Sequence, residues 1–209
     1  MNVIFLGPPG AGKGTQASAV AAALTIPHIS TGDMLRDAIR GGTPTGIKAK
    51  VYMDAGNLVP DDVVIDVVRE RISLTDCANG YLLDGFPRTL DQARALDQIA
   101  AIDAVVDIYV PDEKLIRRLS GRRVCAGCMG TFHLDALNGS DICPVCAKPL
   151  IQRDDDNPDA IANRLDVYHI KTKPLTDYYA DKAILKTVDG NRDVKAVTQS
   201  ILEILAEDS

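Results

Sequence analysis

A glycine-rich stretch near the start of the chain constrains the fold more than any other feature. Residues 7–15, Gly-Pro-Pro-Gly-Ala-Gly-Lys-Gly-Thr, follow the apolar run 3–6 and precede a helical pattern of apolar residues over 17–24. A strand, a glycine-rich turn and a helix in this order are typical of a phosphate-binding loop. The glycines let backbone N–H groups converge on an anion, and the helix start adds further donors. A glycine-rich turn without a ligand is the alternative.

Two side chains of this loop bear on its chemistry. Lys13 supplies a full positive charge for the β- and γ-phosphates of a nucleotide. The general pattern places Ser or Thr directly after the lysine to hold Mg²⁺, but here Gly14 intervenes and Thr15 comes one residue later. We therefore expect phosphate binding, with the metal held more through water than by a direct hydroxyl contact.

Apolar runs and helical patterns alternate along the chain. Strands are expected at 3–6, 26–29, 81–84, 104–110 and 184–188. Helices are expected at 34–40, 46–55, 63–72, 89–99, 111–119, 158–169, 171–182 and 194–205, with Asp61 and Asp62 capping the third and a frayed tail at 207–209. This alternation predicts an α/β fold, a parallel sheet flanked by helices. Ligands of such sheets bind beyond the carboxyl ends of the strands, where both the phosphate loop and Asp84 would lie.

Length, net charge and apolar content limit the kinds of partner that the protein can bind. A chain of 209 residues is long enough for one sizeable core with small inserts. Its net charge of -6 argues against a general affinity for nucleic acid or anionic membranes. No apolar run approaches the length of a membrane span, and no signal peptide is visible. We therefore expect a cytoplasmic protein, and nothing in the sequence suggests an oligomer, so we expect a monomer.

Four of the five cysteines fall in a segment, 122–156, where apolar periodicity fades. Cys125 and Cys128 form one C-x₂-C pair, Cys143 and Cys146 form another, and 14 residues separate the pairs. This spacing predicts one tetrahedral Zn²⁺ site with four thiolate ligands. Such a closed site is structural, because a segment of about 35 residues cannot bury a core of its own. Free thiols or two redox pairs are the alternatives.

Charged residues point to phosphate chemistry. Asp84 ends a predicted buried strand near the phosphate loop, which is the usual place to hold Mg²⁺ directly or through water. A turn-starting aspartate is the alternative. The candidate phosphate-binding arginines are Arg36, Arg88, Arg118, Arg122, Arg123, Arg153 and Arg164. Guanidinium forks suit phosphate oxygens, although for any single arginine a surface ion pair is the alternative.

Several motifs occur in the same order as in a known protein family. They are residues 7–15, Ser30-Thr-Gly-Asp-Met-Leu-Arg36, Asp84-Gly-Phe-Pro-Arg88, Gly121-Arg-Arg123, Gln152-Arg-Asp-Asp-Asp156 and Asn163-Arg-Leu165. Together they resemble the adenylate kinase family, from residue 3 to about residue 190, and the cysteine pairs resemble its long bacterial form with a zinc-binding lid. The Asp-Gly-Phe-Pro-Arg motif is highly specific to nucleoside monophosphate kinases.

The resemblance implies a division of the chain and a set of contacts. It implies a P-loop core of residues 1–29, 60–121 and 157–209, a small helical AMP-binding insert over 30–59 and a zinc-binding lid over 122–156. The implied ATP contacts are Gly10, Ala11, Gly12, Lys13, Gly14, Thr15, Arg118, Arg122, Thr131, Phe132 and Arg192. The implied AMP contacts are Thr31, Arg36, Asn57, Leu58, Val59, Gly85, Phe86, Pro87, Arg88, Gln92, Arg153 and Arg164.

The same resemblance assigns the chemistry and the base specificity. The implied catalytic residues are Lys13, Asp84, Arg88, Arg122, Arg153 and Arg164, with Asp155 and Asp156 helping to close the lid. The amide of Gln92 can donate and accept along the edge of an adenine. Residues 134–139 depart from the family, which usually has an aromatic residue and Asn-Pro-Pro there. This departure concerns how the lid packs on the ATP base and not the reaction.

The expected reaction is reversible transfer of the ATP γ-phosphoryl group to AMP, giving two ADP and balancing the adenine nucleotides, with Mg²⁺ on ATP and a structural Zn²⁺. A kinase for UMP or CMP is one alternative, which the pocket around Thr31, Val59 and Gln92 would decide. A nucleotide-regulated module that binds nucleic acid through its zinc knuckle is another, disfavoured by the acidic net charge. A signalling GTPase is disfavoured because the sequence lacks Asn-Lys-x-Asp.

Overall fold

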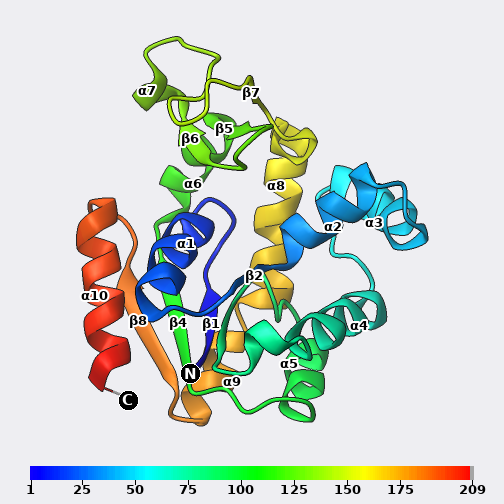
Figure 1. The fold of residues 1–209 in the computed structure, drawn as a ribbon, viewed down its shortest axis with the longest axis vertical. Helices are drawn as coiled ribbons and strands as arrows, with labels where there is room; N and C mark the ends of the chain where they lie inside the picture. Colours follow the sequence, from blue (N-terminus) through cyan, green and yellow to red (C-terminus); the bar gives the residue numbers. More distant parts are fainter. Residues whose placement is uncertain (208–209) are drawn as a thin grey trace.

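A parallel sheet forms the centre of the molecule. The structure, a computed structural model, describes residues 1–207, so residues 208–209 of the expected frayed tail lie outside it (Figure 1). The described strands of this sheet are β1 (Asn2–Leu6), β2 (His28–Ser30), β3 (Tyr81–Asp84), β4 (Ala104–Tyr109) and β8 (Leu185–Asp189). Among the described residues they run parallel in the order β2-β3-β1-β4-β8. The predicted α/β fold is confirmed.

The register of the sheet brings distant residues to one edge. Phe5 of β1 pairs with Asp84 of β3, and Leu6 pairs with Asp107 of β4. Strand β1 is almost completely buried, as expected of a strand covered on both faces. Because β1, β3 and β4 end together, the loop after β1 and the side chain of Asp84 share the carboxyl edge of the sheet.

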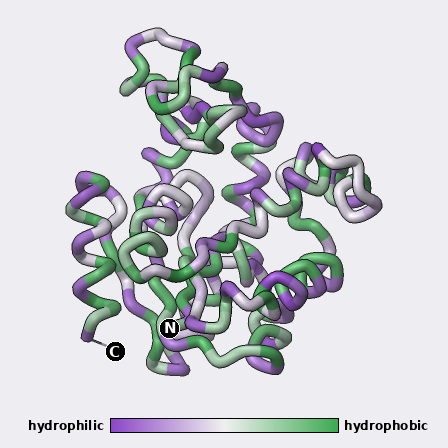
Figure 2. The backbone as a smooth tube through the Cα atoms, viewed as in Figure 1, coloured by the Kyte–Doolittle hydropathy of each residue, from purple (hydrophilic) through white to green (hydrophobic). Residues whose placement is uncertain are grey.

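Helices cover both faces of the sheet (Figure 1). They are α1 (Lys13–Leu24), α4 (Asp61–Ile72), α5 (Leu90–Asp97), α6 (Asp112–Ser120), α8 (Pro158–Val167), α9 (Leu175–Asp181) and α10 (Val194–Glu207), with a short 3₁₀ turn at Thr75–Cys77. One apolar cluster joins one sheet face to α1, α6, α8 and α10, and another joins the opposite face to α4, α5 and α9. Figure 2 shows the alternating colours of an amphipathic surface helix along α10. None of the described helices is long and apolar enough to cross a membrane.

The segment 30–59, here called the helical insert, contains α2 (Thr31–Arg40) and α3 (Pro44–Asp54). Each helix begins at a capping residue. The Ser30 hydroxyl accepts from the N–H of Asp33 at 3.3 Å, and the Thr43 hydroxyl accepts from the N–H of Gly46 at 3.0 Å. These bonds satisfy donors that a helix start otherwise leaves unpaired.

The segment 122–156, here called the cysteine insert, is a small antiparallel sheet. Its described strands are β5 (Arg122–Cys125), β6 (Thr131–His133) and β7 (Leu150–Ile151), in the order β6-β5-β7. A single turn of helix, α7 (Leu134–Leu137), and a 3₁₀ turn at Asp154–Asp156 complete it. The sequence did not predict these strands, because two to four residues are too few to show alternation.

Several expected helix boundaries were wrong. Helix α10 continues to Glu207, which was expected in the frayed tail. Asp61 and Asp62 are the first residues of α4 and do not cap it. Instead, the Asp61 carboxylate accepts from Thr89 Oγ1 at 2.8 Å and from Gln92 Nε2 at 2.7 Å. The helix expected to end at residue 169 and the one expected to start at 171 are joined by a π-helical segment, Tyr168–Thr172.

Candidate active site

A cleft of about 1380 Å³ opens at the carboxyl edge of the sheet, between the two inserts. Most of the residues implied as nucleotide contacts line it. They are Gly10, Ala11, Gly12, Lys13, Gly14, Thr15, Thr31, Arg36, Asn57, Leu58, Val59, Asp84, Gly85, Arg88, Gln92, Arg118, Arg122, Thr131, Phe132, Arg153, Arg164 and Arg192. Phe86 and Pro87 do not line it, and Phe86 is fully buried in the apolar cluster beneath α4 and α5. The four cysteines are displaced from the cleft centre, and of these only Cys128 lines it.

The loop after β1 is shaped by close backbone packing. Gly7 has φ +135°, and a Cβ there would lie 2.6 Å from the carbonyl oxygen of Ile108, so only glycine fits. Gly12 precedes α1 with no side-chain cap, which leaves the first N–H groups of α1 free to bind an anion. Lys13 Nζ donates to the carbonyl oxygens of Gly7 and Pro8 at 2.7 and 2.9 Å. Burial lowers the pKa of Lys13 to about 8, against the opposing effect of Asp84.

Asp84 lies beside this loop. Its Oδ2 is 3.4 Å from His28 Nε2, and His28 Nδ1 is 3.4 Å from the hydroxyl of Ser18. Burial alone would raise the pKa of Asp84, but the His28 and Lys13 side chains outweigh it and hold the pKa below its usual value. The carboxylate is therefore ionised, as a Mg²⁺ ligand must be. His28 is a contact that the sequence did not predict, because a histidine in a short strand gives no signal.

Arginines and carboxylates form a network across the cleft. Arg122 makes a two-pronged pair with Asp156, with Nε 2.7 Å from Oδ2. Arg164 Nη1 lies 3.0 Å from Asp155 Oδ2 and 3.0 Å from Asp156 Oδ1. Arg153 Nη2 lies 3.8 Å from Asp33 Oδ1, so a contact joins the two inserts.

Positive charge is concentrated in this network. Burial lowers the pKa of Arg153 to about 10, with neighbouring Arg36 and Arg122 adding to the effect. Burial likewise lowers the pKa of Arg88 to about 10, with Arg164 adding to it. Both groups remain cationic at neutral pH, so the cleft holds buried positive charges that repel one another. A polyanionic ligand would relieve that repulsion.

The side of the cleft next to the helical insert is built around Arg88. Arg88 Nε donates to the Gly85 carbonyl oxygen at 2.7 Å, and Thr31 Oγ1 donates to the same carbonyl at 2.9 Å. Gln92 is 1% exposed; its Oε1 accepts from the N–H of Arg88 at 2.7 Å, and its Nε2 donates to Asp61. Each of these atoms keeps a second donor or acceptor site that a base edge could use, and the role of Gln92 in base recognition stays a prediction.

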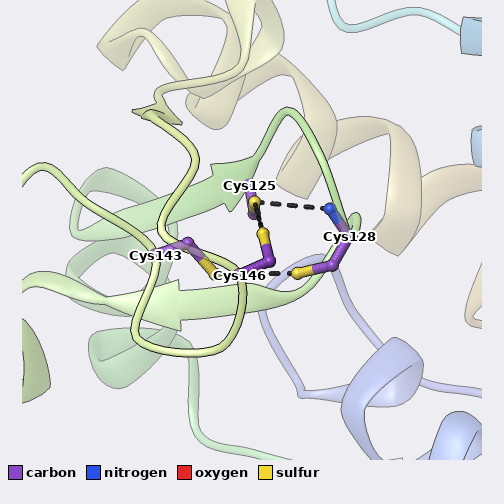
Figure 3. Close-up of side chains that lie close together, drawn as sticks. All are labelled: Cys125, Cys128, Cys143 and Cys146. Atoms are coloured by element: carbon purple, nitrogen blue, oxygen red, sulfur yellow. Dashed lines mark hydrogen bonds between the residues drawn. The ribbon is translucent and has the colours of Figure 1, made fainter.

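The four cysteine side chains point toward one another (Figure 3). Their sulfurs all lie within 4.8 Å of one another, with Cys125 Sγ 3.3 Å from Cys146 Sγ and Cys128 Sγ 3.6 Å from Cys143 Sγ. Zinc–sulfur bonds of about 2.3 Å in a tetrahedron place sulfurs about 3.8 Å apart, so the donor set fits Zn²⁺. The N–H of Cys128, with that of Gly127, lowers the pKa of Cys125 to about 6 against the effect of burial. The Gly130 N–H would lower the pKa of Cys128, but burial and the neighbouring thiols outweigh it and raise that pKa, so thiolate character is concentrated on Cys125.

Comparison with known proteins shows the family of the chain. The family model described as adenylate kinase matches residues 5–184. Curated adenylate kinases of Lachnospira eligens and Staphylococcus aureus are each 50% identical to the chain over 98% of its length, covering 100% and 99% of those proteins. The adenylate kinase of Clostridium acetobutylicum is 49% identical over 99% of the chain and 100% of that protein. The chain belongs to the adenylate kinase family.

In this member of the adenylate kinase family, the opposite side of the cleft lies near the last strand. Arg118 Nη2 donates to the carbonyl oxygen of Gly190 at 3.2 Å, and Arg192 Nη2 donates to Ser200 Oγ at 2.8 Å. Thr131 and Phe132 reach the cleft from β6. The fold therefore brings together the implied ATP contacts from three segments, 10–15, 118–132 and 192, on one cleft.

Proposed function

We propose that the cleft holds ATP along the phosphate loop and AMP beside the helical insert, and that it transfers the γ-phosphoryl group between them as an adenylate kinase. One observation carries this placement. The cleft joins the glycine-rich loop and Lys13, with the Asp84 carboxylate beside them, to Arg88 and Arg36 on the other side. Two anion-binding regions that face a common space suit a donor and an acceptor, each bearing phosphate.

Transfer needs no covalent intermediate on the protein. An oxygen of the AMP phosphate attacks the γ-phosphorus, and the bond from that phosphorus to the oxygen bridging to the β-phosphate breaks. Lys13 leaves the carbonyls of Gly7 and Pro8 to follow the transferred group. Arg88, Arg122, Arg153 and Arg164 stabilise the charge spread over its oxygens. Preorganised cations in a site that excludes water are suited to this task.

The family uses Mg²⁺, and we propose that Asp84 and Thr15 hold it, largely through water. The ionised, buried carboxylate of Asp84 beside the loop fits that role. Bound Mg²⁺ neutralises charge on the donor phosphates. For the cysteine insert we propose a structural Zn²⁺ on Cys125, Cys128, Cys143 and Cys146, which the sulfur distances support.

We propose that the two inserts close over the substrates, with residues 30–59 covering AMP and residues 122–156 acting as the lid over ATP. The contact of Arg153 with Asp33 supports a shared movement. Closure would exclude water, which would otherwise accept the phosphoryl group. We propose that the active form is a monomer; sedimentation would test this.

A direct assay tests the assignment. ADP formation from Mg-ATP is measured with AMP, UMP, CMP and GMP offered separately, for the native protein and for Lys13→Met. We expect strong preference for AMP and a loss of about 10³-fold in turnover for the variant. Preference for a pyrimidine monophosphate would keep the mechanism and overturn the role of Gln92. ATP binding without transfer to any acceptor would contradict the proposal and favour a nucleotide-regulated module.

A further inference from the structure

One turn of the helical insert is fastened to α8 by a side chain that lies outside the cleft. Asn163 Nδ2 donates to the carbonyl oxygen of Ala55 at 2.7 Å and to Asn57 Oδ1 at 2.9 Å. These two acceptors come from the end of α3 and the segment after it, more than 100 residues away in sequence. Asn163 therefore links the core to the strip of chain that leads into Leu58 and Val59.

The backbone of the same turn independently shows this docking. Gly56 has φ +74°, and a Cβ there would lie 2.7 Å from the carbonyl oxygen of Ala160 and 3.0 Å from Arg164 Cγ. The turn at residues 55–57 thus lies against α8 more closely than any residue with a side chain would allow. The two bonds of Asn163 hold this close approach in register.

The docked turn is adjacent to the charged network of the cleft. Arg164, the next residue along α8, contacts both Asp155 and Asp156 at the end of the cysteine insert. Asn57, the last residue of the docked turn, lines the cleft together with the next residues, Leu58 and Val59. Movement of this turn away from α8 would therefore displace residues 57–59 relative to the arginines.

We propose that Asn163 is a positioning residue for the acceptor nucleotide. It does not touch the cleft; it acts by holding the 55–57 turn on α8, which presets residues 57–59 for AMP. This inference rests on the proposed placement of AMP beside the helical insert. When the turn is released, the segment must be ordered at the moment AMP binds, and that ordering weakens binding.

The expected effect is moderate and selective. Loss of two partly exposed hydrogen bonds should weaken AMP binding about three- to tenfold in Kd. Binding of ATP in the absence of AMP should change less than about twofold, because the phosphate loop and Arg118 have no contact with the turn. The KM for AMP should rise while turnover at saturating AMP is largely kept.

The test compares Asn163→Ala with Asp166→Ala, which removes an exposed side chain from the same helix. Alanine favours a helix interior more than asparagine does, so weaker AMP binding by Asn163→Ala cannot arise from a weakened α8. Calorimetric titrations give Kd for AMP and for ATP separately. Hydrogen exchange reports whether amides at 55–59 lose protection, and thermal unfolding reports the stability of the whole protein.

We expect Asn163→Ala to weaken AMP selectively and to speed exchange at 55–59, and Asp166→Ala to change neither. An AMP Kd within twofold of the native value, tighter AMP binding, or equal weakening of ATP would overturn the inference. The Arg88→Ala variant distinguishes a failure of the role of Asn163 from a failure of the proposed AMP site. If it weakens AMP while Asn163→Ala does not, only the role of Asn163 fails; if Arg88→Ala also leaves AMP binding unchanged, the placement of AMP itself is wrong.

Discussion

The helical insert and the cysteine insert flank the same cleft, but their apolar residues pack in different cores. Leu35, Ala49 and Val59 of the helical insert belong to the large apolar cluster that includes Ile4 and Leu83 of the central strands. This insert has no core of its own, since its apolar side chains extend the core of the sheet domain. Its stability is therefore coupled to that of the whole molecule.

The cysteine insert instead has a separate, minimal cluster. That cluster consists of Cys125, Leu137, Cys143 and Leu150, with Phe132 packed against it. Two of its members, Cys125 and Cys143, are among the four thiols that would bind the metal. The apolar core of this insert therefore overlaps its metal site. Such a small core cannot offset the entropy of ordering about 35 residues. The helical insert therefore folds with the core of the sheet, whereas we expect the cysteine insert to fold with the proposed Zn²⁺.

The largest effect should come from breaking the metal site. Cys143→Ser should reduce bound zinc from about one ion per chain to near zero and unfold residues 122–151, because zinc binding contributes on the order of 10 kcal/mol to such sites. Hydrogen exchange in the helical insert should stay unchanged. Metal analysis and exchange mass spectrometry check both statements.

Cys77→Ser is the matched control, because Cys77 is buried far from the cluster under α4 and α5. It should leave the zinc content unchanged. A zinc-free Cys143→Ser protein with native protection over 122–151 would show that the cysteine insert does not need its metal.

The next largest effect should come from shortening an apolar side chain of the helical insert. Leu35 is 6% exposed, and Leu35→Ala should lower the free energy of unfolding by about 2–4 kcal/mol. Because Leu35 packs in the shared cluster, the midpoint of global unfolding should fall. Ile142→Ala, at a 52% exposed position of the cysteine insert, should change stability by less than about 0.5 kcal/mol. Local fraying of α2 with an unchanged global midpoint would contradict the coupling.

A fall in pH should weaken the contact between the cysteine insert and α8. Burial alone would raise the pKa of Asp155, but Arg164 and neighbouring arginines outweigh it and hold the pKa below its usual value. The Asp155–Arg164 pair therefore stabilises the contact of the cysteine insert with α8 fully above about pH 4, the ordinary pKa of an aspartate. This stabilisation is lost as the pH falls through the lower pKa of the folded protein. In the helical insert, the packing of Leu35 and Ala49 involves no proton. Asp33 at its edge does respond to acid as Asp155 does, because burial would raise its pKa but Arg36 and Arg153 outweigh burial and lower that pKa. Carboxyl-carbon NMR titration checks the direction, and Asp155→Asn should abolish the change at Arg164.

The smallest effect should come from a helix cap. Thr43→Ala removes the oxygen that accepts from the N–H of Gly46 and should cost about 1 kcal/mol, seen as faster exchange at the start of α3. Thr43→Ser keeps the oxygen and should restore protection. If both variants behave alike, the cap does not stabilise the helical insert.

The sequence predicted the features that rest on local pattern. The phosphate loop, the carboxyl-edge position of Asp84 and the pairing of the cysteines each followed from spacing within a few residues. The short strands of the cysteine insert did not, because their pairing depends on the fold of the metal site. Asp61 was assigned to a helix cap, since its partners Thr89 and Gln92 lie about 30 residues away. His28 and Asn163 were missed as site residues for the same reason, because tertiary contacts set their roles.

The order of the sheet has a consequence for how the protein is made. Strand β1 leaves the ribosome first but lies between β3 and β4, which are made about 80 and 100 residues later. Gly7 packs on the carbonyl oxygen of Ile108, so the nucleotide loop cannot take its final shape until β4 has emerged. A growing chain therefore carries a loop that is complete in sequence before the strand on which it packs has been made. The final packing of this loop belongs to the late steps of folding.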